Sequence, residues 1–244
     1  MQTKYTKELT ILPSMCDSAA ALGVPDAFAL FMDAATEHSG VLGCGLDVLG
    51  PRGLFWLTVR TRVKFFRRPR MLERAAVSTW PEAPGKLRVN RCYTIEGGGG
   101  LLVAGKTEWA VLDQSAGRLH PMADVFAPGS GFAPESVWDE PFTRLNDEAM
   151  DEFARYTVRS TDIDLGGHMN NTAYLRALAS LFSCAAWQGM NLREVEIAYR
   201  AACYEGDTLC WQKREDGGAL ALRAALPGGK TIALARLVTG EAPE

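Results

Sequence analysis

The sequence contains few residues that could hold a metal ion. Only three of its 244 residues are histidines, and no two of its six cysteines form a CxxC pair. Structural zinc sites are built from closely spaced cysteine and histidine ligands. We therefore expect no zinc site.

Long apolar runs and an excess of one charge are also missing. The longest apolar stretch, AYLRALASLFSCAAW, is interrupted by Arg176 and is shorter than the roughly 18 residues of a membrane-spanning helix. The first ten residues, MQTKYTKELT, lack the apolar core of a secretory signal. The net charge of −3 gives no reason to expect a nucleic acid or a membrane surface as partner. We predict a cytoplasmic location and cysteines that stay reduced.

The predicted elements occur twice in the same order. Residues 4–12 predict a strand, 24–43 carry apolar residues at helical spacing, and four strand-like segments follow between 53 and 113. The order returns with a strand at 154–164, one helix at 170–187 and four strands between 193 and 240. Between the halves, prolines and glycines indicate a linker. We place the N-terminal half at 1–120, the linker at 121–150 and the C-terminal half at 151–244.

This order predicts an α+β fold. A long helix beside hairpin-linked strands indicates an antiparallel sheet wrapped around that helix. Two such units, each with one exposed sheet edge, could pair into a continuous sheet. The architecture that fits is a tandem double hotdog.

Polar side chains gather where the second helix should begin. Asp162 and Asp164 are predicted to share one strand face, because side chains repeat every second residue. His168 follows, and Asn170 or Asn171 is placed to cap the helix. The first-turn N–H groups and the helix dipole would stabilise an oxyanion there. A carboxylate and an imidazole beside it could activate water as general base.

A plainer interpretation of the same residues is that they are turn and cap residues around a packed histidine. Asp, Asn and Gly before a helix are ordinary turn formers, and turn chemistry alone favours this interpretation.

The segment DIDLGGHMNNTAY (162–174) resembles the signature of the acyl-acyl-carrier-protein (acyl-ACP) thioesterases, roughly D-x-D-x-N-x-H-V-N-N-x-x-Y. Three further segments are similar in sequence to segments of that family and occur in the same order: residues 53–95, 105–122 and 197–209. The chain thus resembles a bacterial relative of the plant fatty acyl-ACP thioesterases, whose fold is a tandem double hotdog.

The resemblance implies a function and a set of site residues. Water would hydrolyse a fatty acyl-ACP thioester, releasing fatty acid and the carrier's thiol, with no metal or bound cofactor. Asp164 and His168 match the catalytic aspartate and histidine, and Cys203 is retained. The Asn expected between the first two is replaced by Gly166, and the Glu expected before Cys203 is replaced by Ala202. Hydrolysis could therefore range from weak to absent.

Several alternatives stay open. Cys203 could act as nucleophile with His168 as its base. Alternatively, Asp162 or Glu205 could help Asp164 and His168 to activate water. An acyl or acyl-ACP binding protein without turnover would explain Gly166 and Ala202. Dehydratases and hydratases also use Asp and His on hotdog folds, but the Asn-Asn-Tyr context speaks against them.

A basic segment suggests where an acidic carrier protein could dock. The predicted docking residues are Arg60, Arg62, Lys64, Arg67 and Arg68. The first three alternate and should share one strand face, which could equally be a solvated outer face of the sheet. The sequence does not determine the preferred acyl chain length or whether the substrate is linked to ACP or to CoA. It also does not determine whether the protein is a monomer or a homodimer.

Overall fold

The computed structural model describes residues 3–127 and 129–240. The chain divides between Pro141 and Phe142 into two compact units. The division falls inside the predicted linker, 121–150, of which residue 128 lies outside the described residues. In the described part of the chain, no helix is both long and apolar enough to cross a membrane.

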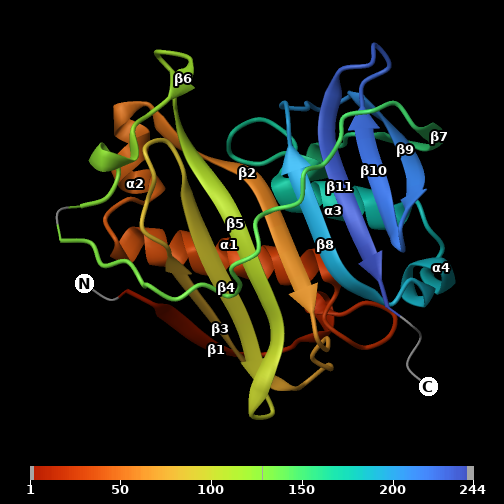
Figure 1. Ribbon diagram of the computed structural model, residues 1–244, viewed down its shortest axis with the longest axis horizontal. Helices are drawn as coiled ribbons and strands as arrows, with labels where there is room; N and C mark the ends of the chain where they lie inside the picture. The colour runs from red at the N-terminus through yellow and green to blue at the C-terminus, as the bar shows by residue number, and fades with distance from the viewer. Residues whose placement is uncertain (1–2, 128, 241–244) are drawn as a thin grey trace. The chain divides into compact units, whose positions relative to one another are not determined.

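The first unit is an antiparallel sheet with helix α1 (Val24–Val41) against one face (Figure 1). The helix and the four strands predicted between 53 and 113 are confirmed. The strands pair in the order β1-β3-β4-β5-β2, with β6 beside β5. The elements are β1 (Tyr5–Thr10), η1 (Pro13–Met15), α1, α2 (Leu46–Leu49), η2 (Gly50–Arg52), β2 (Leu54–Phe65), β3 (Arg74–Pro81), β4 (Val89–Gly97), β5 (Gly100–Asp113), β6 (Arg118–Leu119) and η3 (Met122–Asp124).

Helix α1 packs closely on its sheet because of one glycine. Phe28 and Phe31 are buried on the helix face, and the Phe31 ring stacks on Tyr93 of β4 with centroids 4.8 Å apart. A Cβ at Gly105 of β5 would lie 2.5 Å from the Phe31 ring. The glycine therefore gives the aromatic side chain its space in the core.

The second unit repeats the arrangement with a shorter helix. Its strands are antiparallel in the order β8-β11-β10-β9-β7. Helix α3 buries Tyr174, Leu175 and Leu178. The elements are β7 (Asp151–Thr157), η4 (Ser160–Asp162), α3 (Asn171–Ser180), α4 (Cys184–Gly189), β8 (Leu192–Tyr199), β9 (Thr208–Asp216), β10 (Ala219–Ala225) and β11 (Thr231–Thr239).

Two predictions for the second unit are wrong in detail. The single helix at 170–187 is interrupted, because α3 ends at Ser180 and Ser183 caps α4 by accepting the Ala186 N–H at 3.2 Å. The strand at 154–164 ends at Thr157, and a 3-10 turn follows at Ser160–Asp162. In both places a side-chain cap begins the element that follows, α4 in the first case and the 3-10 turn in the second.

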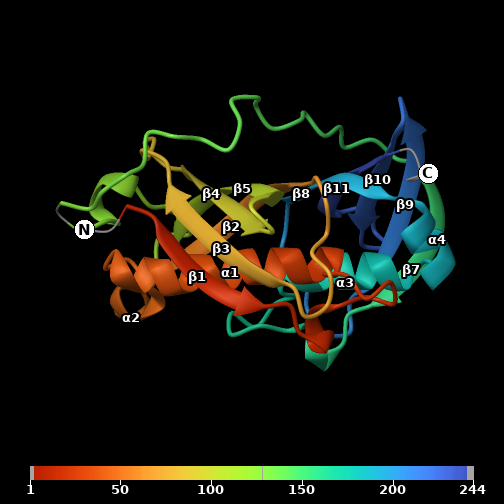
Figure 2. The same cartoon turned by 90° about the horizontal axis from the view of Figure 1, so that it is seen from below.

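The segment predicted as a linker is a strap that crosses the outer sheet faces, opposite the helices (Figure 2). In the first unit Trp80 Nε1 donates to the Glu135 carbonyl at 2.8 Å, and Lys106 Nζ donates to the Trp138 carbonyl at 2.8 Å. In the second unit the buried Glu196 accepts the Thr143 N–H at 3.0 Å. Strap backbone groups thus satisfy polar side chains on the sheet.

The anchoring of the strap leads to a stability prediction. Lys106 is buried, pairs with Glu82 at 3.0 Å and donates to Ser136 and Trp138 of the strap. The Lys106→Met variant loses these bonds and leaves Glu82 without its cation, so we expect the free energy of unfolding to fall by about 2 kcal/mol.

Urea denaturation measures this change, with Lys86→Met as the matched control because Lys86 is exposed in the same unit. Equal stability of the two variants would contradict the anchoring role of Lys106.

Candidate active site

The segment 163–169 forms a tight turn that presents two titratable side chains. Ile163 and Met169 form an antiparallel bridge, and the Asp164 N–H donates to the His168 carbonyl at 3.0 Å. Gly167, at φ +77°, closes the turn by donating its N–H to the Asp164 carbonyl at 3.0 Å. Glycine adopts this backbone conformation without steric cost. The turn therefore brings the side chains of residues 164 and 168 to the same side.

Asp164 and His168 lie together, as the sequence predicts for a catalytic pair. His168 Nδ1 is 3.7 Å from Asp164 Oδ1, and the two side chains are 42% and 33% exposed. The same carboxylate oxygen accepts the Gly166 N–H at 2.8 Å. The imidazole is thus accessible to water, with an oriented carboxylate behind it. Such contacts between a base and its partner are often long in ligand-free sites and shorten when substrate binds.

Asp162 lies in a 3-10 turn, so the prediction that it shares a strand face with Asp164 is wrong. Its Oδ2 accepts the Tyr156 hydroxyl and the Arg159 N–H, both at 2.8 Å. These bonds hold the 3-10 turn in place of the expected strand. Asp162 therefore has a structural role in supporting the site.

The sequence predicts that Asn170 or Asn171 caps the helix, and Asn170 is the N-cap of α3. Its Oδ1 accepts both the Thr172 N–H and the Thr172 hydroxyl at 2.8 Å. Asn171 is the first residue of the helix, and its carbonyl accepts the Tyr199 hydroxyl at 2.9 Å. The helix begins three residues after His168, so its positive end lies at the site. A role of Asn170 and Asn171 toward an oxyanion stays a prediction.

Cys203 is placed as a buried structural thiol. Its carbonyl accepts the Met169 N–H at 2.8 Å, which ties the turn to the loop after β8. Burial, together with the charge and hydrogen bond of Asp207, raises the pKa of the Cys203 thiol to about 12. A thiol in such surroundings stays protonated near neutral pH and is a poor nucleophile. The burial of Cys203 and its raised pKa therefore argue against the Cys203 mechanism.

Three further residues lie around the turn and were not predicted as site residues: Tyr174, Tyr204 and Asp207. Tyr174 is buried, and its pKa is raised by burial and by the nearby Cys203, Asp207 and Asp164. The Tyr204 ring lies 6.1 Å from the His168 ring. Tyr174 ends the quoted signature one helical turn after Asn170, and this signal could have identified it. Asp207 and Tyr204 come from the loop after β8, in which only Ala202, Cys203 and Glu205 were considered from the sequence.

Arg60, Arg62 and Lys64 share one strand face as predicted, but that face is not free. Their register partners on β5 are Glu108, Lys106 and Ala104, on the side crossed by the strap. Arg62 is buried. The face is therefore only partly solvated, with Arg60 and Lys64 still partly exposed.

The cations at the predicted docking surface are paired within the chain. Arg60 pairs with Glu108 at 3.3 Å, and Lys64 pairs with Glu140 of the strap at 3.0 Å. Arg67 pairs with Glu73 at 2.6 Å and holds the pKa of that carboxyl at about 2, while Arg68 pairs with Asp17. Internal pairing of this kind reduces the positive field available to an acidic partner. The structure does not support these residues as a docking surface.

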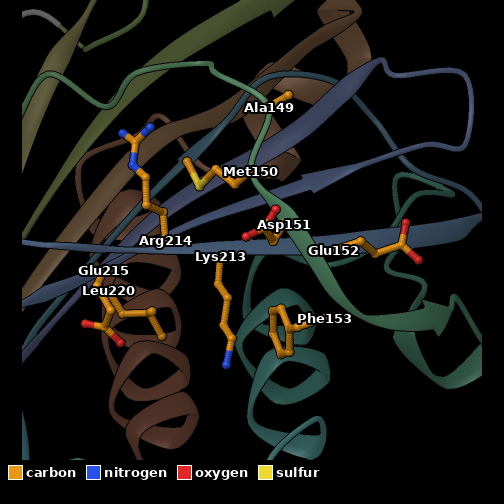
Figure 3. Close-up of a pocket in the computed structure, with 9 residues that line it drawn as sticks. All are labelled: Ala149, Met150, Asp151, Glu152, Phe153, Lys213, Arg214, Glu215 and Leu220. Atoms are coloured by element: carbon orange, nitrogen blue, oxygen red, sulfur yellow. The ribbon is translucent and has the colours of Figure 1, made fainter.

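A cleft of about 530 Å³ opens elsewhere in the second unit (Figure 3). Its lining comes from β7, β9, β10 and the end of the strap, and it includes neither Asp164 nor His168. Lys213 Nζ lies 5.0 Å from the Phe153 ring centroid (Figure 3). Among residues 3–127 and 129–240, no group of three His, Cys, Asp or Glu side chains could hold a metal ion.

Family models match both units of the chain. The model of the acyl-ACP thioesterase N-terminal domain matches residues 2–128, and that of the C-terminal domain matches residues 145–237.

Curated relatives include an oleoyl-acyl carrier protein thioesterase of Coriandrum sativum, 23% identical over 64% of this chain and 46% of the relative. An acyl-[acyl-carrier-protein] hydrolase of Cuphea viscosissima is 23% identical over 74% of this chain and 47% of the relative. Both are chloroplastic. The chain spans about half the length of the curated relatives it matches.

Solved structures confirm the double hotdog fold. An acyl-ACP thioesterase from Bacteroides thetaiotaomicron superposes with a TM-score of 0.88 at 20% identity, covering 98% of both chains. The 12:0-ACP thioesterase from Umbellularia californica gives a TM-score of 0.81 at 18% identity, covering 98% of this chain and 97% of its own.

The surroundings of Cys203 lead to a reactivity prediction. At pH 8 a thiol with a pKa of about 12 is ionised to a fraction on the order of 10⁻⁴. We expect iodoacetamide to alkylate the exposed Cys184 of the native protein and to leave Cys203 unmodified.

Mass spectrometry of peptides from the native and the urea-unfolded protein measures both cysteines. Alkylation of native Cys203 as fast as Cys184 would show an activated thiol and would restore the nucleophile hypothesis.

Proposed function

The chain belongs to the acyl-ACP thioesterase family, and we propose that it hydrolyses fatty acyl-ACP thioesters to free fatty acid and the carrier's thiol. The observation that carries the proposal is the Asp164–His168 pair, 3.7 Å apart and accessible to water at the start of α3. The N-terminal unit is assigned to binding the acyl chain, and the C-terminal unit carries the catalytic turn.

His168 is the general base in this mechanism. Its imidazole takes a proton from a water molecule as the water oxygen bonds to the thioester carbonyl carbon. Asp164, beside Nδ1, orients the ring and stabilises the imidazolium that forms. When the tetrahedral intermediate collapses, the carbon–sulfur bond breaks and the imidazolium returns the proton to the leaving thiolate. No metal or bound cofactor takes part in these steps.

The start of α3 is assigned to the oxyanion of the intermediate. The N-terminal end of a helix carries a partial positive charge and unsatisfied N–H groups. The first-turn backbone and the Asn170 amide nitrogen are therefore the donors proposed for the developing negative charge. Preorganised donors of this kind commonly supply about 10²–10³ in rate.

Two departures from the family signature bear on the rate. Gly166 stands where an Asn is expected, and the exposed Ala202 stands where a Glu is expected. A methyl group cannot accept a proton or orient water, so Ala202 supplies none of that function. Losses within one catalytic unit are not additive. We infer a slower enzyme whose base is the Asp164–His168 pair alone.

Ala202 favours a second candidate function, an acyl or acyl-ACP binding protein with little turnover. Without the expected carboxylate the same turn could hold a thioester without activating water efficiently. Retention of labelled acyl-ACP by the wild type without release of thiol would identify this function.

The first prediction for the proposed enzyme concerns the carboxylate. Purified wild-type protein should release thiol from long-chain acyl-ACP, detected with a disulfide reagent. Asp164→Ala should lower kcat by about 10²-fold or more, because an unoriented imidazole is a poor base.

Asp216→Ala is the matched control, since Asp216 is exposed at the end of β9 in the same unit. Equal kcat for Asp164→Ala and the control would reject Asp164 as a catalytic residue. A folded wild-type protein that releases no thiol from any acyl chain would reject the enzyme.

A further inference from the structure

Gly166 and Gly167 are adjacent, but a side chain is excluded at each for a different physical reason. Gly167 has φ +77°, and a Cβ there would meet no atom within 4 Å, so it is required by the backbone. Gly166 does not lie in the left-handed region. A Cβ built on it would instead lie 2.5 Å from His168 Cε1 and 3.0 Å from His168 Nδ1. Gly166 is therefore required for space.

The space that a side chain at position 166 would need is occupied by the His168 ring. The same Cβ would lie 3.1 Å from Asp164 Oδ1, so it would press on both members of the pair. The Gly166 N–H meanwhile donates to Asp164 Oδ1 at 2.8 Å. One residue thus orients the carboxylate through its amide and makes room for the imidazole by having no side chain.

We propose that Gly166 is a positioning residue of the catalytic pair, and this rests on the proposed function. Its bare Cα lets the His168 ring lie beside Asp164, so that carboxylate and imidazole meet directly at 3.7 Å. In this chain the glycine makes room for a direct Asp–His pair, and it also removes the amide that the family signature places there. An Asn at this position begins with the same Cβ and would displace the ring.

Displacement of the ring should cost activity and little stability. The His168 side chain is 42% exposed and ends in the ring that the new Cβ would touch. The ring can rotate toward solvent without moving the backbone. Misplacement of a catalytic group by about 1 Å can cost about 10²-fold in rate. Substrate contacts elsewhere are unchanged, so KM should stay the same.

Kinetics of Gly166→Ala test the proposal against a matched control. We expect kcat to fall about 10²-fold with KM within about twofold of wild type. Gly166→Asn should behave in the same way. Gly189→Ala should match the wild type, because Gly189 lies in the same unit, has no left-handed φ, and its Cβ would meet nothing within 4 Å. A Gly166→Ala variant with wild-type kcat would overturn the proposal.

A double-mutant cycle separates positioning from a general structural effect. Asp164→Asn should lower kcat strongly in the wild type and by less than about tenfold on the Gly166→Ala background, because the contact is already broken there. Losses that simply multiply would overturn the proposal, since Gly166 would then act independently of Asp164.

A crystal structure of Gly166→Ala gives a readout that needs no turnover. We expect the distance between His168 Nδ1 and Asp164 Oδ1 to exceed that of a wild-type crystal structure, with the backbone of residues 163–169 unchanged. An unmoved ring would overturn the proposal even in an inactive protein. Failure of the proposed function shows separately, as absence of thiol release by the wild type.

Discussion

The candidate site depends on the backbone of one turn. Ile163 and Met169 pair across it, and the Met169 N–H donates to the Cys203 carbonyl at 2.8 Å. The Asn170 N–H donates to the Asp162 carbonyl at 2.8 Å. Backbone bonds to two neighbouring segments thus fix a loop that sheet pairing alone would leave free. Catalytic side chains on loops need such support, because rate falls steeply with misplacement.

The strap pairs with charged side chains that are buried on the two sheets. Sheet faces turned away from the helices carry buried charged side chains, among them Lys106, Glu196 and Arg223. Strap groups pair with each of them, for example Asp147 with Arg223 Nε at 2.9 Å. Buried charge costs several kcal/mol unless it is paired. The strap is therefore part of the structure of both units, and it also occupies the face on which a carrier protein was expected.

Much of the fold could be predicted from the sequence because the helix and strand periodicities are strong. Helix α1 and most of the strands follow from such patterns. The break between α3 and α4 was missed because Ser183 acts through a local cap inside an apolar stretch. The course of the strap could not be predicted, because prolines and glycines indicate irregular backbone without showing where it packs.

For the site, the Asp164–His168 contact followed from the signature, but the role of the residues around it did not. Asp162 was assigned by strand alternation, and a 3-10 turn broke that alternation. The burial of Cys203 and the pairing of the basic segment are tertiary properties, which composition and spacing do not encode.

The proposed hydrolysis requires that the thioester carbon lies beside the Asp164–His168 pair at the start of α3. A co-crystal structure with a ketone analogue of the acyl-pantetheine substrate, in which a methylene replaces sulfur, tests it most directly. We expect the ketone carbon to lie beside His168, with its oxygen toward the first turn of α3. A ketone bound elsewhere, for example in the cleft beside Lys213 and Phe153, would contradict it.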